Sequence, residues 1–176
     1  GLYETWRLPL ALATLTAGMV GALAAPNLAR LAAWLVIASI GLLLTAFSAG
    51  PAGIAAGLYY LPHSTFAAAL LFLLAEALRR RRMASTDFFQ PEFDLPRHAL
   101  WGGLFFFAAV AAAGLPPLSG FLAKFMILRA APGTVWIAIL LAALFGTIAL
   151  ARAGSALFFS THTVEIPAPG KPAPLV

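Results

Sequence analysis

Long apolar runs that contain very few charged residues make up most of this 176-residue chain. About twenty apolar residues in a helix, at ~1.5 Å each, cross a hydrocarbon core of about 30 Å. The chain is 62% hydrophobic and 10% charged, with a mean hydropathy of +0.94. Soluble domains carry about 25% charged residues, so this composition excludes a water-soluble globule and predicts a membrane protein made of helices.

Uncharged runs bounded by helix-breaking residues predict an all-α polytopic bundle of five transmembrane helices, the fourth of them broken. The fourth run is too long for one ordinary span, and Pro116 and Pro117 interrupt it because each proline removes a backbone donor. We expect a transmembrane domain over 1–160, with spans at about 8–25, 31–49, 53–78, 98–131 (broken near 115–120) and 135–151. A polar loop, 79–97, and a Pro-rich tail, 161–176, complete the chain.

Basic residues beside these spans predict the orientation, because Lys and Arg accumulate on the cytoplasmic side of a membrane. With five spans, seven arginines share one side and two share the other; the seven are Arg30, Arg79 to Arg82, Arg97 and Arg152, and the two are Arg7 and Arg129. The N-terminal end is then outside, and the loop 79–97 and the C-terminal end are cytoplasmic. The net charge of +5 is thus explained by topology, without nucleic acid as a partner.

Lys124 is the main candidate for chemistry, because a charge inside an apolar segment is costly and usually functional. A helix broken within a bilayer leaves backbone groups that only protein or water can satisfy, so we expect a hydrated cavity beside Lys124. Burial disfavours the charged form of lysine, which allows such a residue to gain and lose a proton. The alternative is that Lys124 extends to the outer interface beside Arg129.

His63 is the second candidate, because histidine changes protonation near neutral pH and can pass a proton onward. It follows Pro62, which we expect to kink the third span. The alternative is a neutral histidine that is hydrogen-bonded between helices. Ser39, Thr65 and Tyr59 are possible hydroxyls of a water path, although a hydroxyl more commonly bonds back to its own helix.

Other patterns concern packing and composition. Gly53 and Gly57 form a small-xxx-small pattern, which predicts close packing between helices. The chain has no cysteine, which excludes disulfides and thiolate metal sites. We expect no metal and no cofactor.

Three strings resemble one family. Residues 113–125, AGLPPLSGFLAKF, resemble the signature of the antiporter-like subunits shared by Mrp-type cation/proton antiporters and respiratory complex I. Residues 57–66, GLYYLPHSTF, are similar to the family's central histidine-bearing helix, and the His-Ser-Thr form resembles the D-type subunit of Mrp (Pha) antiporters. Residues 21–25 and 28–41 resemble its short loop and following helix.

The resemblance implies the second of two inverted five-helix repeats in a longer subunit, so that we expect an internal fragment, a split subunit or part of a subunit. Lys124 matches the lysine of the family's broken helix, and His63 matches a relay position; Pro116, Pro117, Ser119 and Gly120 form the break. Two positions depart from the pattern. Complex I relatives often have a histidine where Ser39 stands, and many members have a lysine near Ala68, so water or hydroxyls would have to replace both.

The implied function is proton translocation by a subunit of a multisubunit monovalent cation (Na⁺)/proton antiporter in the bacterial inner membrane, and not enzymatic catalysis. The implied partners are other membrane subunits, the first repeat of the same subunit, the lipid bilayer, protons and monovalent cations. The close alternative is a proton-pumping subunit of complex I or of a membrane-bound hydrogenase. A rival from another class is an intramembrane serine hydrolase, with Ser119 as nucleophile and His63 or Lys124 as base. A scaffold in which Lys124 tolerates replacement is a third possibility.

Overall fold

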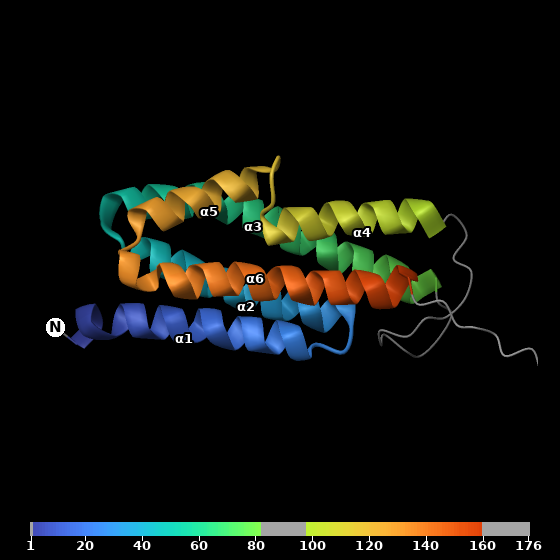
Figure 1. Cartoon of the computed structure of the whole chain (residues 1–176), viewed down its shortest axis with the longest axis horizontal. Helices are drawn as coiled ribbons and strands as arrows, with labels where there is room; N and C mark the ends of the chain where they lie inside the picture. Colours follow the sequence, from blue (N-terminus) through green and yellow to red (C-terminus); the bar gives the residue numbers. More distant parts are fainter. Residues whose placement is uncertain (1, 82–97, 160–176) are drawn as a thin grey trace, which may run out of the picture.

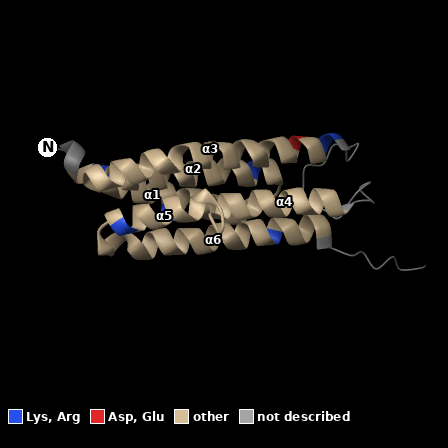
Figure 2. Ribbon diagram, turned by 90° about the horizontal axis from the view of Figure 1, so that it is seen from above, with Lys and Arg blue, Asp and Glu red and all other residues tan. Residues whose placement is uncertain are grey.

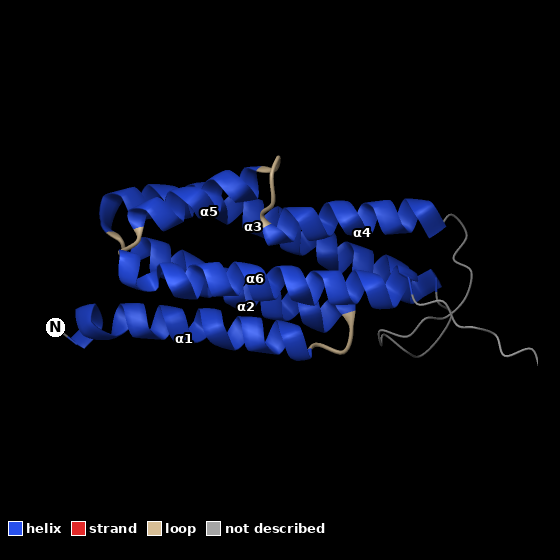
Figure 3. Cartoon of the chain, viewed as in Figure 1, coloured by secondary structure: helices blue, strands red, loops and turns tan. Residues whose placement is uncertain are grey.

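The computed structural model describes residues 2–81 and 98–159, and every regular element within these ranges is a helix (Figure 3). The elements in order are α1 (Leu2–Ala24), α2 (Leu28–Phe47), α3 (Gly50–Arg81), α4 (His98–Ala113), α5 (Ser119–Ala130), the 3₁₀ turn η1 (Gly133–Val135), α6 (Trp136–Gly154) and the π turn η2 (Ser155–Phe159). The predicted all-α fold is confirmed. The tail 161–176 and all but the first residues of the loop 79–97 lie outside the described ranges.

Four helices of the described chain are long and apolar enough to cross a membrane, judged by length and composition: α1, α2, α3, and α6 with its flanking turns. Helices α4 and α5 are shorter, at 16 and 12 residues. Figure 1 shows them end to end along one edge of the bundle, with a non-helical segment between them. The break predicted near 115–120 is therefore present, whereas a fifth span made of α4 and α5 together stays a prediction.

Local chemistry explains how the chain reverses at the turn between α1 and α2. Asn27 is extended, with φ −145°, and its Oδ1 accepts a hydrogen bond of 2.8 Å from the backbone N–H of Arg30. This N-cap satisfies one of the amide groups that the first turn of α2 leaves unpaired. From α6, Arg152 donates a 2.8 Å hydrogen bond to the carbonyl oxygen of Ala25. The last apolar helix is thereby tied to the first turn.

The second turn brings α2 and α3 into close contact. Gly50 begins α3 with φ +77°, a left-handed conformation that favours glycine. A Cβ added at Gly53 would overlap the carbonyl oxygen of Ala46, and one added at Gly57 would lie 2.6 Å from the Phe47 ring. The close packing predicted from the two glycines is therefore confirmed.

The buried residues form two hydrophobic clusters, and the break lies where they meet. One cluster takes residues from α4, including Phe105 and Ala108, together with the C-terminal halves of α3 and α6. The other takes Ala123 and Ile127 from α5, together with the opposite halves of α3 and α6. Each half of the broken segment therefore has its own core, and α3 packs against both halves.

The outer surface of the bundle is apolar over most of its length. Phe66 is 75% exposed, and Leu73, Phe106 and Ile137 are each 70% exposed. Large exposed apolar areas mark contact with a membrane or with other proteins. Figure 2 shows charged residues mostly toward the two ends of the bundle, and uncharged residues over the middle. This pattern is typical of a multi-pass membrane protein.

Candidate functional site

The chain leaves α4 through a glycine-terminated cap. Gly114 has φ +71°, and its N–H donates to the carbonyl oxygens of Val110 and Ala111, both at 3.1 Å. The N–H of Leu115 also reaches the Val110 oxygen at 3.1 Å. This is the Schellman arrangement, which closes a helix by pairing carbonyls of its last turn. The next two carbonyls have no helical N–H partner, because the residues four positions after them are prolines.

Lys124 satisfies both of these carbonyls. Its Nζ donates to the oxygen of Ala113 at 2.6 Å and approaches that of Ala112 at 3.4 Å. The carbon stem of Lys124 packs on Gly114, where an added Cβ would lie 2.9 Å from the lysine Cδ. A cation at the C-terminal end of a helix is favoured by the helix dipole. Lys124 of α5 thus caps the C-terminal end of α4.

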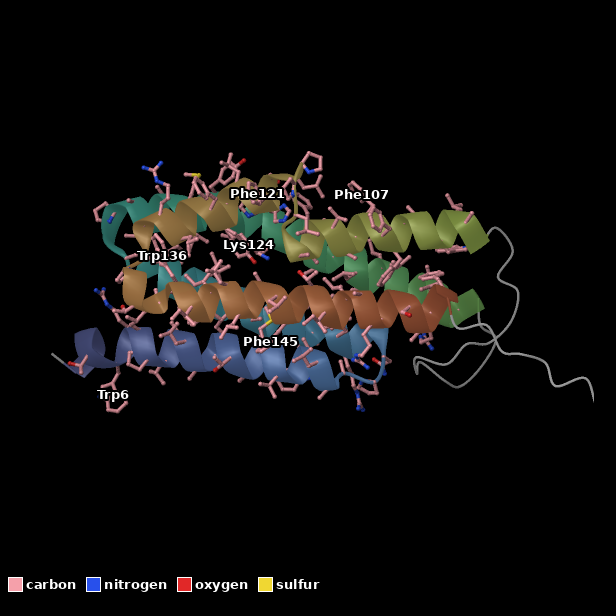
Figure 4. The ribbon with its side chains drawn as sticks, in the orientation of Figure 1. Trp6, Phe107, Phe121, Lys124, Trp136 and Phe145 are labelled. Carbon is pink, nitrogen blue, oxygen red and sulfur yellow. The ribbon has the colours of Figure 1, made fainter. Side chains whose placement is uncertain are left out.

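Lys124 is directed into the bundle rather than along α5 toward its end (Figure 4). Its amine bonds to the end of α4, and the side chain is half-buried. Arg129, the basic residue of the last turn of α5, is exposed. The alternative in which Lys124 extends to the interface beside Arg129 is therefore not the arrangement in this structure.

His63 reaches the same helix end from α3. Its Nε2 lies 2.9 Å from the carbonyl oxygen of Ala111, and its Nδ1 lies 3.0 Å from Oγ of Ser119. Helix α3 is assigned as one continuous helix through Pro62. The backbone of Gly120 lies directly against the imidazole, since an added Cβ would overlap the ring at Nε2. The imidazole therefore bridges α3, α4 and α5 at the break.

A cavity of about 50 Å³ connects the two candidate residues. Polar groups that line it come from α2, α3 and α5: Ser39, Tyr60, His63, Ser64 and Lys124. A site for one water needs roughly 10–15 Å³ and two to four polar partners, so this cavity has room for a few waters. A short hydrated connection between Lys124 and His63 is thus sterically possible.

Of the three hydroxyl residues predicted for a water path, Ser39 lines the cavity and Tyr59 and Thr65 do not. Ser39 lines the cavity, although its Oγ donates to the carbonyl of Val36 at 2.8 Å. Tyr59 is 42% exposed, and Thr65 is exposed and bonds back to Leu61 at 2.9 Å. Neither of these two lines the cavity. Ser39 and Ala68, the two positions noted as departures from the resembling family's pattern, both line it.

Tyr60 is not among the three hydroxyls predicted for the water path, and the backbone oxygens at the end of α4 were not predicted either. Tyr60 is 4% exposed and lines the cavity with its ring centroid 6.3 Å from that of His63. The cavity-lining residues of α3 recur at helical spacing, at positions 60, 63, 64, 67, 68 and 71. This stripe was the available signal: Tyr60, Ser64 and Ala68 follow one another at four-residue steps on it, whereas Tyr59 and Thr65 fall outside it.

The described residues include no group of three or more His, Cys, Asp or Glu side chains that could hold a metal ion. The carboxylate of Glu76 forms ion pairs with Arg79 at 2.8 Å and Arg80 at 2.6 Å, toward the end of α3. This cluster is partly exposed and far along the helix from His63. The chemistry available at the break is therefore proton exchange between an amine, an imidazole, a hydroxyl and backbone carbonyls.

Comparison with known proteins points to one family of membrane subunits. Residues 2–149 match the family described as NADH:quinone oxidoreductase/Mrp antiporter, TM. The probable D-type subunit of a K⁺/H⁺ antiporter from Rhizobium meliloti is 31% identical over 201 residues, which include 95% of this chain and 37% of that protein. The D-type subunit of an Na⁺/H⁺ antiporter from Bacillus subtilis is 33% identical over 119 residues, which include 67% of this chain and 24% of that protein.

A solved structure has the same fold. A chain of respiratory complex I from Thermus thermophilus with bound NADH superposes with a TM-score of 0.82 at 25% sequence identity, covering 91% of this chain and 35% of that one. The present chain thus spans well under half the length of each of these proteins.

Proposed function

This chain belongs to the NADH:quinone oxidoreductase/Mrp antiporter family, and from that membership we propose that it translocates protons as part of a multisubunit monovalent cation/proton antiporter. The proposal assigns it to the D-type subunit, of which it supplies one repeat. The two antiporter relatives, each named as a D-type subunit, support this assignment. The remainder of the subunit, further membrane subunits, lipid, protons and a cation such as Na⁺ or K⁺ are the proposed partners.

The observation that carries the proposal is the position of Lys124. Its amine bonds to the carbonyls that end α4, and its side chain lines the cavity. When the amine is charged, the carbonyls and the helix dipole stabilise it. When it is neutral, its two N–H groups can still donate to the carbonyls, and the cavity has room for a water that donates to the amine lone pair. Both protonation states therefore have partners, which is what a residue that repeatedly gains and loses a proton requires.

Lys124 and His63 are coupled in this mechanism because they share one helix end. His63 bonds to Ala111, and Lys124 bonds to the two carbonyls that follow. Two positive charges at one site disfavour each other in a medium of low polarity. A proton that arrives at one residue therefore promotes the departure of a proton from the other. Lys124 is the proposed site that exchanges with the outside, and His63 is the next site.

The orientation belongs to the same proposal. The end of the bundle that carries the α1–α2 turn, the end of α3 and the start of α4 faces the cytoplasm. The end that carries the α2–α3 turn and η1 faces outward. The arginine distribution supports this direction through the positive-inside rule. The proposed location is the inner membrane of a bacterium.

Replacement of Lys124 by alanine tests the proposal. In the intact complex, Lys124→Ala should reduce cation-driven proton transport in everted membrane vesicles to background while co-purification of the subunits persists. Arg129→Ala is the matched control, because it removes a positive charge from the same helix at an exposed position away from the cavity. Normal transport with Lys124→Ala would contradict the assigned role and favour a scaffold.

A second candidate is a proton-pumping subunit of complex I or of a membrane-bound hydrogenase. The superposition on a complex I chain favours it. Purification of the native assembly separates the two candidates, since redox subunits with flavin or iron–sulfur absorbance accompany a pump. Transport that responds to Na⁺ or K⁺ without an electron donor identifies an antiporter instead.

A further inference from the structure

The hydrogen bonds of His63 define which ring nitrogen carries its proton. A carbonyl oxygen can only accept, so the 2.9 Å contact with Ala111 requires a hydrogen on Nε2. In the neutral imidazole, Nδ1 is then bare and must accept a hydrogen bond. Ser119 is the group at that nitrogen, with its Oγ at 3.0 Å. The Ser119 hydroxyl consequently donates to neutral His63.

Protonation of His63 reverses this bond. Both nitrogens of an imidazolium are donors, so Nδ1–H then requires an acceptor. A hydroxyl can fill both roles, because it carries one hydrogen and two lone pairs and rotates about its C–O bond. Backbone carbonyls and amides, which have one fixed role each, cannot do so. Serine is therefore suited to a partner whose protonation state changes.

The hydroxyl of Ser119 is available because of its place at the start of α5. Most other hydroxyls of the described helices and their caps donate to a carbonyl three or four residues earlier in the chain, as do those of Thr14, Thr16, Ser39, Thr45, Ser48, Ser64, Thr65 and Thr147. Ser119 is the first residue of its helix and has no preceding helical turn. Its Oγ is thus directed to the imidazole instead.

Neighbouring groups hold the His63 imidazole in place while the Ser119 hydroxyl rotates. The backbone of Gly120 packs against the ring, so the ring cannot move further toward α5. The titratable groups that share the cavity with His63 are Tyr60 from its own helix and Lys124 from α5. Helix α4 contributes Ala112 to the cavity, α2 contributes Ser39 among apolar residues, and α1 and α6 contribute apolar side chains. No carboxylate in the described chain lines this cavity to take the place of Ser119.

We propose that Ser119 is a positioning residue for proton transfer, whose hydroxyl donates to Nδ1 of neutral His63 and accepts from Nδ1–H of the imidazolium. The proposal rests on the proposed function, because it assigns Ser119 to the His63 step of that pathway. Ser119 exchanges no proton itself in this scheme. Its effect is to give each protonation state of His63 a partner.

Transport assays with Ser119 variants in the intact complex test this proposal. A hydrogen bond to a charged group is stronger than one to a neutral group, so Ser119→Ala should disfavour the imidazolium more than the neutral ring. Transport should then fall about tenfold toward the alkaline side of the pH profile, where protonation of His63 becomes limiting. Ser119→Thr retains the hydroxyl and should restore the profile. Ser48→Ala is the control, because the Ser48 hydroxyl bonds to its own helix far from the break. An unchanged profile for Ser119→Ala, or no rescue by threonine, would overturn the proposal.

Solid-state ¹⁵N NMR of the assembled complex provides a second measurement that does not depend on transport. The His63 signals are identified by their loss in His63→Gln. At alkaline pH we expect a protonated Nε2 and a hydrogen-bonded, bare Nδ1, with the Nδ1 shift displaced in Ser119→Ala. The opposite tautomer would refute the scheme.

The outcomes also separate this inference from the proposed function. Loss of transport in Lys124→Ala with a normal profile in Ser119→Ala removes only the role of Ser119. Normal transport in both variants removes the proposed function as well. Labelling of the native complex by a fluorophosphonate probe that disappears in Ser119→Ala would establish the serine as a nucleophile, and it would overturn both.

Discussion

At the scale of single residues, Gly120 offers a test that leaves every polar group of the site in place. A methyl group at this position would overlap the His63 ring, which is held on its other sides by Ala111 and Ser119. Gly120→Ala should therefore displace the imidazole and break at least one of its two hydrogen bonds. We expect transport to fall about tenfold or more, since a misplaced reacting group is costly even when its chemistry is intact.

Gly103→Ala is the matched control for that variant. Gly103 lies within α4, and a Cβ added there meets nothing within 4 Å. Alanine is also the better helix former, by about 1 kcal/mol. Normal transport in Gly103→Ala together with loss in Gly120→Ala would locate the effect at the imidazole. Equal activity of the two variants would show that the position of His63 does not limit transport.

The residues of the site differ in how far the sequence could predict them. Lys124 and the break were predictable, because a charge and two prolines in an apolar run are each costly in a membrane. The partners of Lys124 were not, since backbone carbonyls have no signature in a sequence. The hydroxyl path was only partly predictable. Ser39 lies on the cavity, whereas Tyr59 and Thr65 lie on exposed faces of α3 and Tyr60 takes the buried position.

At the scale of the elements, the packing of α1 on α2 depends on two glycines. A Cβ at Gly41 would overlap the backbone of Leu15, and one at Gly18 would overlap the backbone of Ala38. Helices in membranes approach this closely only where small residues allow it. Gly41→Ala should therefore separate the two helices and destabilise the protein by about 1–3 kcal/mol, as overpacking does.

The measurement for Gly41→Ala is the fraction of the purified complex that remains folded after stepwise heating in detergent. The midpoint should fall relative to the unsubstituted protein, whereas Gly103→Ala, which adds the same methyl group in open space, should leave it nearly unchanged. A midpoint unaltered by Gly41→Ala would mean that α1 and α2 can separate at no cost.

The bounds of the helices show what hydropathy can and cannot predict. The apolar run of the first span was expected to begin near residue 8, but α1 begins at Leu2; α3 likewise continues to Arg81, past the expected end at 78. Hydropathy reports which residues can face lipid, whereas backbone hydrogen bonding continues through polar residues at the membrane surface. The division of the fourth run into α4 and α5 followed directly from the two prolines.

At the scale of the whole molecule, the two hydrophobic clusters fix the position of the break between α4 and α5. Each half of the broken segment is anchored in a separate hydrophobic cluster, and α3 passes beside both. The end of α4 is therefore held at the middle of the bundle, where Lys124 and His63 can reach it. Sequence patterns predicted the break itself, but which helices surround it is a property of tertiary packing that no local pattern encodes.

The proposed orientation can be tested with single cysteines, because the chain contains no cysteine of its own. Thr134→Cys in η1 and Ala24→Cys at the end of α1 are exposed positions at opposite ends of the bundle (Figure 1). The predicted topology assigns seven of the nine arginines to the side of Ala24, which the positive-inside rule identifies as cytoplasmic. A membrane-impermeant maleimide should then label Thr134→Cys in intact cells and Ala24→Cys only in everted vesicles. The reverse labelling pattern would mean that the bundle has the opposite orientation, with α5, which carries Lys124, toward the cytoplasm. Labelling of both positions from one side would contradict the count of an odd number of membrane crossings between them.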